Sequence, residues 1–95
     1  MLFMVIERFK PGQREAIGER FKRRGRMLPE GVTYVASWLE EGAGELCFQL
    51  MESPRREDMD PWLSAWNDLV DFEVFPVLSS VDYWARQAKL DSESA

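Results

Sequence analysis

The sequence contains no histidine and a single cysteine among its 95 residues. Without histidine the chain cannot form a Ser–His or Cys–His nucleophile pair, and it cannot ligate haem or a metal ion through imidazole. One cysteine, Cys47, excludes a thiolate zinc cage and an internal disulfide. A glycine-rich phosphate loop is also missing. These absences give no ground for predicting a cofactor or a metal site, and we expect Cys47 to be buried and unreactive.

Long apolar runs are missing as well. The first apolar stretch covers residues 1–6 and ends at Glu7 and Arg8, which is too short for the core of a signal peptide. A helix that spans a bilayer needs about 20 apolar residues, and no run approaches that length. Small secreted domains usually carry several cysteines. We therefore predict a cytoplasmic protein without a membrane partner.

Charge is distributed unevenly along the chain. The formal net charge is -5, but the segment Arg8–Arg26 holds eight basic and two acidic residues, a net +6 that leaves -11 for the remainder. The overall acidity argues against a nucleic-acid partner. Two interpretations of the basic residues stay open: a solvated face that suits the end of a helix, or a site for an anionic ligand. The cluster consists of Arg20, Lys22, Arg23, Arg24 and Arg26.

The chain has the length of one domain and many apolar residues for that size. Apolar residues make up 45% of it, and four of them are Trp. A domain this short buries only roughly 60–68% of the surface of its unfolded chain, so surplus apolar surface should find a partner. We predict a single domain over residues 1–90 and a disordered polar tail over residues 91–95.

Hydrophobic periodicity predicts four strands and three helices. The predicted strands cover residues 2–9, 32–40, 45–52 and 72–78. The first helix covers residues 13–24, the second begins at Ser53-Pro54 or at Asp60-Pro61, and a short C-terminal helix covers residues 81–90. Gly25 should end the first helix in a left-handed conformation. Pro76 removes one ladder hydrogen bond, so the fourth strand should lie at an edge.

This order of elements predicts an α+β fold of ferredoxin-like βαββαβ layout. Right-handed crossovers place two helices on one face of a four-stranded antiparallel sheet and leave the other face bare. Alternation assigns Leu46, Phe48 and Leu50, with Met4 and Ile6, to the helix side. The bare face then carries Phe3, Val5, Glu7, Phe9, Tyr34, Trp38, Gln49, Met51, Glu73, Phe75 and Val77.

A face with so many aromatic side chains is unfavourable in water, at roughly 25 cal/mol for each Å² of apolar area. A second copy, packed sheet against sheet, is the simplest cover. We therefore predict a homodimer, a dimeric α/β barrel whose inner surface is the bare face.

Four segments resemble, in order and spacing, the bacterial family of the domain of unknown function DUF3303: MLFMVIERFKPG, RFKRRGRMLPEGVTYVASW, CFQLME and WNDLVDFEVFPV. That family is similar to the dimeric α/β-barrel superfamily, in which two ferredoxin-like sheets form one barrel. The resemblance covers about residues 1–80, whereas residues 55–60 and the C-terminal helix depart from the usual pattern. It implies the fold but no single activity, because the relatives include cofactor-poor monooxygenases, isomerases, haem-handling proteins and binding modules.

Three polar residues interrupt the predicted inner face: Glu7, Gln49 and Glu73. A buried carboxyl often has a raised pKa, so Glu7 or Glu73 is a candidate acid–base group, and all three are candidates for gripping a ligand. Alternatively, they pair with arginine or glutamine and fix the register of the dimer.

Aromatic residues give a second set of candidates. Tyr34 and Trp38, four residues apart on a strand, should share the inner face with Phe75 and line an aromatic ligand pocket. Alternatively, these rings pack at the dimer interface. Trp62 and Trp66 follow the helical spacing of a core stripe.

The sequence therefore predicts a dimeric protein that binds a small apolar or aromatic molecule in an inner cavity. Two alternatives remain: a cofactor-independent monooxygenase or isomerase with Glu7 or Glu73 as the base, and a purely structural or regulatory dimer. The residues do not decide whether there is catalysis.

Overall fold

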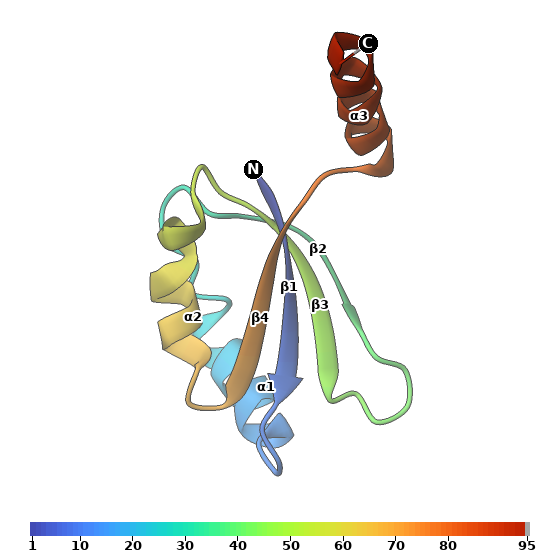
Figure 1. The fold of residues 1–95 in the computed structure, drawn as a ribbon. Helices are drawn as coiled ribbons and strands as arrows, with labels where there is room; N and C mark the ends of the chain where they lie inside the picture. Colours follow the sequence, from blue (N-terminus) through green and yellow to red (C-terminus); the bar gives the residue numbers. More distant parts are fainter. Residues whose placement is uncertain (95) are drawn as a thin grey trace.

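The computed structural model describes residues 1–94 and has the predicted order of strands and helices (Figure 1). The elements are β1 (Leu2–Phe9), α1 (Arg14–Arg24), β2 (Thr33–Leu39), β3 (Leu46–Glu52), a 3₁₀ turn η1 (Arg56–Met59), α2 (Asp60–Trp66), β4 (Val70–Val77) and α3 (Ser80–Ser94). All strand pairs are antiparallel, in the sheet order β2-β3-β1-β4. This α+β architecture agrees with the predicted ferredoxin-like layout.

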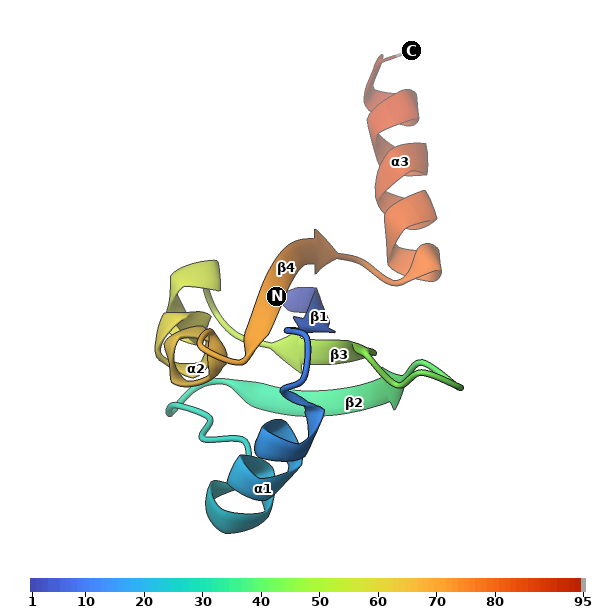
Figure 2. The same ribbon diagram turned by 90° about the horizontal axis from the view of Figure 1, so that it is seen from below.

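Helices α1 and α2 lie on the same side of the sheet, as Figure 2 shows. Strand β4 is an edge strand, which explains how Pro76 is tolerated there. The other edge is β2, and the two edges do not pair with each other. The sheet of one chain is therefore open, so a barrel requires a second copy.

Local sequence signals set the ends of the helices. Gly25 follows α1 with a φ of 65°, and its N–H bonds back to a carbonyl in the last turn, as a C-terminal glycine does. Helix α2 begins at Asp60-Pro61, the second of the two predicted starts, after the short turn η1. Ser79 caps α3, because its Oγ accepts the N–H of Asp82 at 3.0 Å.

The hydrophobic core lies between the sheet and α2. It contains Phe3, Val5 and Met51, which are buried under the helix with Trp62 and Met59. The predicted facing of β1 and β3 is therefore wrong, whereas that of β4 is correct, with Phe72 and Val74 against the core. The residues that lie on the helix-free face instead are Met4, Ile6, Leu46, Phe48 and Leu50.

The reversal has a physical reason. Alternation decides which residues of a strand share a face, but it does not decide which face the helices cover. Both sets are apolar on β1 and β3, and the helices cover the set that includes Glu7 and Gln49. On β2 a bulge between Tyr34 and Ala36 shifts the alternation, so Tyr34 faces the helices while Trp38 faces away.

Helix α3 is longer than predicted and stands clear of the body. It continues through residues 91–94, which the sequence predicted to be disordered, whereas Ala95 lies outside the described residues. None of its residues is buried, and Figures 1 and 2 show it projecting beyond the end of β4. The radius of gyration is accordingly 16.1 Å, whereas about 12 Å is typical of a compact domain of this length. Within residues 1–94, neither α3 nor any other helix has the length and apolar character of a membrane span.

The corrected facing of β3 can be tested with two neighbouring residues. Met51→Ala should lower the free energy of unfolding by about 2–5 kcal/mol, because it leaves a void in a packed core. Leu50→Ala changes a half-buried residue of the helix-free face and should cost clearly less in the monomer. Urea denaturation at high dilution measures both values. Equal losses would contradict this assignment of the two faces.

Candidate functional site

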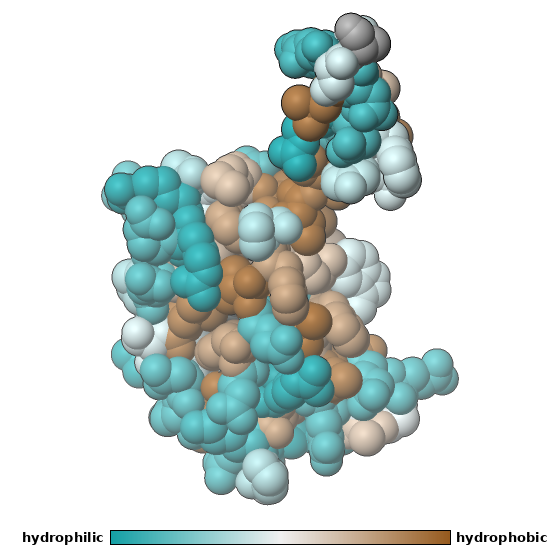
Figure 3. Space-filling view, viewed as in Figure 1, coloured by the Kyte–Doolittle hydropathy of each residue, from teal (hydrophilic) through white to brown (hydrophobic). Residues whose placement is uncertain are grey.

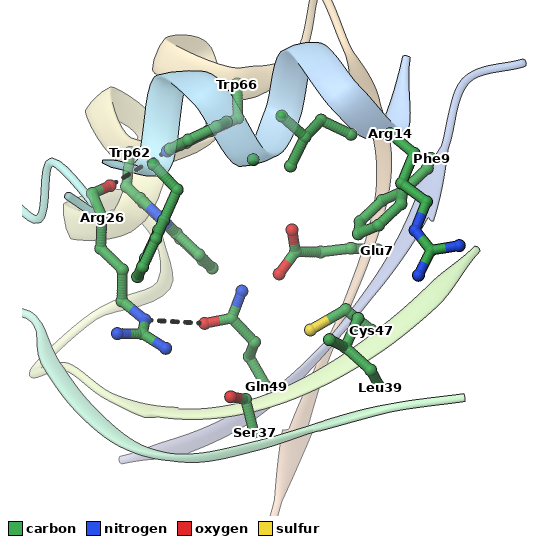
Figure 4. A pocket seen from close by; sticks show the side chains of 13 residues that line it. Glu7, Phe9, Arg14, Arg26, Ser37, Leu39, Cys47, Gln49, Trp62 and Trp66 are labelled. Atoms are coloured by element: carbon green, nitrogen blue, oxygen red, sulfur yellow. Dashed lines mark hydrogen bonds between the residues drawn. The ribbon is translucent and has the colours of Figure 1, made fainter. Parts of the chain in front are cut away.

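A cavity of about 380 Å³ lies between the helix-covered face of the sheet, α1 and α2 (Figure 4). Small-molecule sites usually have volumes of roughly 300–1,000 Å³. The walls are mainly apolar: Phe9 comes from β1, Ile17 and Phe21 from α1, and Trp62 and Trp66 from α2.

Helix α1 forms the outer wall, and Ile17 and Arg20 join it to the body of the domain. None of its residues is buried. Arg20 donates to the two carboxylate oxygens of Asp68 at 2.8 and 2.7 Å and to the carbonyl of Ala65 at 2.9 Å. Its guanidinium also lies 5.5 Å from the ring centre of Trp66. This bidentate contact fixes the spacing of α1 from α2, and hence the width of the cavity.

Gly18 lies in the middle of α1 and lines the cavity. An interior glycine destabilises a helix by roughly 0.5–1 kcal/mol relative to alanine. A Cβ at this position would meet no atom within 4 Å, so packing does not require a glycine. The missing side chain leaves the space inside the cavity open.

Glu7 brings a carboxyl group to the floor of the cavity. It pairs across the sheet with Cys47 of β3 and Phe72 of β4, and it is only 7% exposed. Its Oε2 atom is buried without a hydrogen-bond partner among residues 1–94. Burial raises the pKa of Glu7 from 4.5 to about 7, against smaller lowering effects of the Cys47 thiol and the Arg26 guanidinium. The carboxyl group therefore changes its charge near neutral pH, as a general acid or base requires.

Cys47 lies beside Glu7 and also lines the cavity. Burial, followed by the nearby Glu7 carboxyl, raises the pKa of the Cys47 thiol to about 12. The thiol is therefore protonated at neutral pH and is a poor nucleophile, as the sequence predicted. Among residues 1–94, no three His, Cys, Asp or Glu side chains are grouped so that they could hold a metal ion.

Arg26 reaches the cavity from the loop that follows α1. The φ of Met27 is positive, at 59°, and together with Gly25 it turns the chain sharply around Arg26. The indole Nε1 of Trp66 donates to the carbonyl of Arg26 at 3.0 Å. The guanidinium lies 3.6 Å from the ring centre of Tyr34, and its Nε donates to Gln49 Oε1 at 3.4 Å. Trp66 therefore fixes the backbone of Arg26, and Tyr34 packs against the face of its guanidinium.

The structure divides the predicted site residues between the two faces of the sheet. Glu7 and Gln49 line the cavity together, and Tyr34 lies next to it under Arg26. The remaining three, Trp38, Glu73 and Phe75, lie on the helix-free face and do not join this site. Their assignment to the same face as Glu7 is wrong, because the bulge in β2 and the opposite phase of β4 separate them.

Three polar residues of the cavity were not identified as site candidates on their own: Arg14, Arg26 and Ser37. The sequence groups Arg26 with a basic cluster at the end of a helix. The sequence signal that distinguishes Arg26 from the rest of the basic cluster is Gly25. This glycine ends the helix before Arg26 and turns the chain toward the sheet. Ser37 lies beyond the bulge in β2, where it pairs with Gln49.

A family model shows where this chain belongs. The model of a domain of unknown function, DUF3303, matches residues 1–91. The chain belongs to the DUF3303 family. The match includes most of α3, which the resemblance noted in the sequence did not reach.

Among solved structures, this DUF3303 chain is similar to the crystal structure of protein Atu4242 from Agrobacterium tumefaciens. The TM-score is 0.47 at 16% sequence identity, and the alignment covers 84% of this chain and 96% of that one. Among curated proteins, none matches the chain.

The buried carboxyl predicts a pH-dependent stability. The pKa of Glu7 is higher in the folded protein than its ordinary value of 4.5, so the unfolded chain loses the proton first as the pH rises. Folding is therefore favoured most below pH 4.5, and this contribution is lost as the pH rises to about 7, a difference of about 3 kcal/mol. Glu7→Gln removes the titration and should abolish this fall. At alkaline pH the variant should therefore be the more stable protein.

Urea denaturation of the two proteins at acidic, neutral and alkaline pH measures this difference. The exposed Glu45→Gln is a matched control, because it makes the same chemical change in the loop before β3 and should follow the wild type. Parallel curves for Glu7→Gln and the wild type would contradict a raised pKa for Glu7.

Proposed function

We propose that this DUF3303 protein binds a small apolar or aromatic molecule in the cavity between the sheet and its two helices. The observation that supports this most directly is a mainly apolar cavity on which Glu7, Gln49 and Arg26 converge. Ligand sites usually combine apolar walls with a few polar groups that fix the orientation of the ligand. Gly18 adds support, because its small size keeps this space open at a cost to the helix.

A second candidate function is a cofactor-independent monooxygenase or isomerase in which Glu7 is the base. The pKa of about 7 and the free Oε2 favour it, since a base works best when its pKa is close to the working pH. Glu73 is no longer a candidate, because it forms an exposed ion pair with Arg8 at 3.1 Å on the other face. Native mass spectrometry of protein purified from its host tests both functions. A co-purified molecule supports binding, and its conversion during incubation supports catalysis.

Gly18→Leu tests whether the cavity is the binding site. The leucine should fill part of the cavity and lower the affinity for 2-naphthamide, a neutral aromatic probe, by about tenfold or more. The helix itself should be as stable as before or better, because leucine is the stronger helix former. Isothermal titration calorimetry gives the affinities, and thermal melting gives the stability.

The control for this variant is Ala16→Leu, which places the same side chain at an exposed position of α1 outside the cavity. Its affinity for the probe should equal that of the wild type. The proposal fails if the wild type does not bind the probe, or if Gly18→Leu binds it as tightly as Ala16→Leu does.

We also propose that the protein is a homodimer formed through the helix-free face. Figure 3 shows apolar side chains gathered over the middle of this face. The residues on it are Met4, Ile6, Ala36, Trp38, Leu46, Phe48, Leu50, Phe75 and Val77. Trp38 is 55% exposed and Phe75 is 45% exposed, which is unfavourable for aromatic side chains in water.

The area of the face fits a second copy. Strands about 4.8 Å apart, with a rise of about 3.3 Å per residue, give four strands of seven residues a footprint of roughly 440 Å². Two such faces cover roughly 900 Å², close to the ~1,000 Å² of total buried area that a stable interface needs. Helix α3 projects on the same side of the sheet and would add to this area.

Helix α3 is the second part of the proposed interface. Val81 is 79% exposed and Trp84 is 66% exposed, and both lie in the first turns of the helix. A free helix of this length is only marginally stable in water, so it needs a tertiary contact. The body of the same chain buries none of its residues, so the partner copy is the proposed source of this contact.

Sedimentation at micromolar concentration should give twice the 11.1 kDa of one chain. Truncation after Ser79 removes α3 and should weaken the dimer and lower the melting temperature. The double variant Val81→Ser/Trp84→Ser should have the same effect, whereas Lys89→Ser, an exposed polar residue of the same helix, should have none. An 11.1 kDa species for the full chain would reject the dimer, and unchanged association after truncation would reject the role of α3.

A further inference from the structure

Two arginines line the cavity without an acidic partner. Of the other six basic residues of the segment Arg8–Arg26, three form ion pairs with acids: Arg8 with Glu73, Lys10 with Asp71 and Arg20 with Asp68. The exposed Lys22, Arg23 and Arg24 form none within residues 1–94, but they do not line the cavity. Arg14 and Arg26 line the cavity, and neither forms a salt bridge with a carboxylate of residues 1–94. The chain carries 17 acidic residues, so acids are not scarce. The positive charge inside the cavity is therefore available to a ligand.

Arg26 is oriented to receive a planar anion. Its guanidinium is stacked on Tyr34, and its one side-chain hydrogen bond within residues 1–94 uses Nε. The two terminal nitrogens remain free as donors, and such a fork matches the two oxygens of a carboxylate. Gln49 and Ser37 lie on the same side of the cavity in Figure 4, so an amide and a hydroxyl group are close to the same position.

We propose that the ligand of this cavity is an aromatic molecule with one carboxylate, or a similar planar oxyanion, that binds to Arg26. This inference rests on the proposed binding function of the cavity. Phe9, Trp62 and the other apolar walls enclose the ring, while Arg26 and Gln49 bind the anionic group. Arg14, on the opposite side of the cavity in Figure 4, adds positive potential without contacting the same group.

Glu7 does not oppose an anion below neutral pH. Its carboxyl group faces Cys47 from β3, Arg14 from α1 and Arg26 from the following loop, whereas the cavity residues of α2 are not ionisable. Because burial raises the pKa of Glu7 to about 7, the group is largely protonated below that pH. A protonated carboxyl group donates a hydrogen bond and adds no negative charge to the cavity.

The test compares two probes of nearly the same shape, 2-naphthoate and 2-naphthamide, by isothermal titration calorimetry slightly below neutral pH. The wild type should bind the anion about tenfold more tightly than the amide, as one charge-assisted contact allows. Arg26→Gln should lower the affinity for 2-naphthoate about tenfold and that for 2-naphthamide clearly less. Arg24→Gln is the matched control, because it removes the same charge from an exposed residue of α1 that does not line the cavity. Its affinities should equal those of the wild type.

Equal affinities of the wild type for the two probes would overturn the inference and leave the proposed binding function intact. An equal loss of both probes in Arg26→Gln would also overturn it, because Arg26 would then shape the cavity without binding the anion. A loss of 2-naphthoate in Arg24→Gln that matches the loss in Arg26→Gln would assign the preference to long-range charge and reject the Arg26 site. If the wild type binds neither probe, the proposed function fails first and the inference fails with it.

Discussion

The sheet of this protein is apolar on both of its faces, and the described chain covers only one of them, with two short helices and the segments next to them. Helix α2 fills one half of one face, where Trp62 and Met59 are fully buried. Helix α1 has no buried residue and is held at a distance by the contact between Arg20 and Asp68. The space between α1 and the sheet is the cavity, and the other face stays uncovered. The cavity and the uncovered face have the same cause, because the described chain has too few helices to cover both faces of the sheet.

The buried carboxyl of Glu7 supports the proposal that this space is a binding site. A buried carboxylate in a structural role is normally paired with a cation or satisfied by several donors. Glu7 has an unsatisfied Oε2 within residues 1–94, and burial raises its pKa to about 7. The fold therefore carries an unfavourable contribution near neutral pH that Cys47 and Arg26 offset only in part. Contributions of this kind are typical of groups kept for binding or for proton transfer, because such sites trade stability for function.

Sequence periodicity predicts the strands and helices well, but it predicts only in part which side of each strand faces the helices. The bounds of β1 and the end of α1 at Gly25 follow from local patterns, which need no tertiary information. Which side of β1 faces the helices is a tertiary question, and two apolar sets such as Phe3 with Val5 and Met4 with Ile6 do not answer it. The bulge in β2 has no strong sequence signal, since its residues are ordinary strand formers.

The candidate site shows the same division between local and tertiary information. Glu7 and Gln49 were found because polar residues stand out on apolar strands, and the register of β1 with β3 brings them together whichever face is covered. The sequence does not identify Arg26 as a site residue in its own right, because its position depends on a turn with a positive φ at Met27. Residues from loops of this kind are recognised only once the chain is folded.

The two faces of the sheet are coupled through the strands that they share. Because side chains alternate, Glu7 lies between Ile6 and Arg8 of the helix-free face, and Gln49 lies between Phe48 and Leu50. Covering the helix-free face therefore restrains the same two strands that form the floor of the cavity. Both are central strands, hydrogen-bonded on each side, so the floor is rigid. The outer wall is different, since α1 has no buried residue and contacts the body through Ile17 and Arg20. The proposed ligand would therefore meet a rigid floor and an outer wall whose position depends on the Arg20–Asp68 contact.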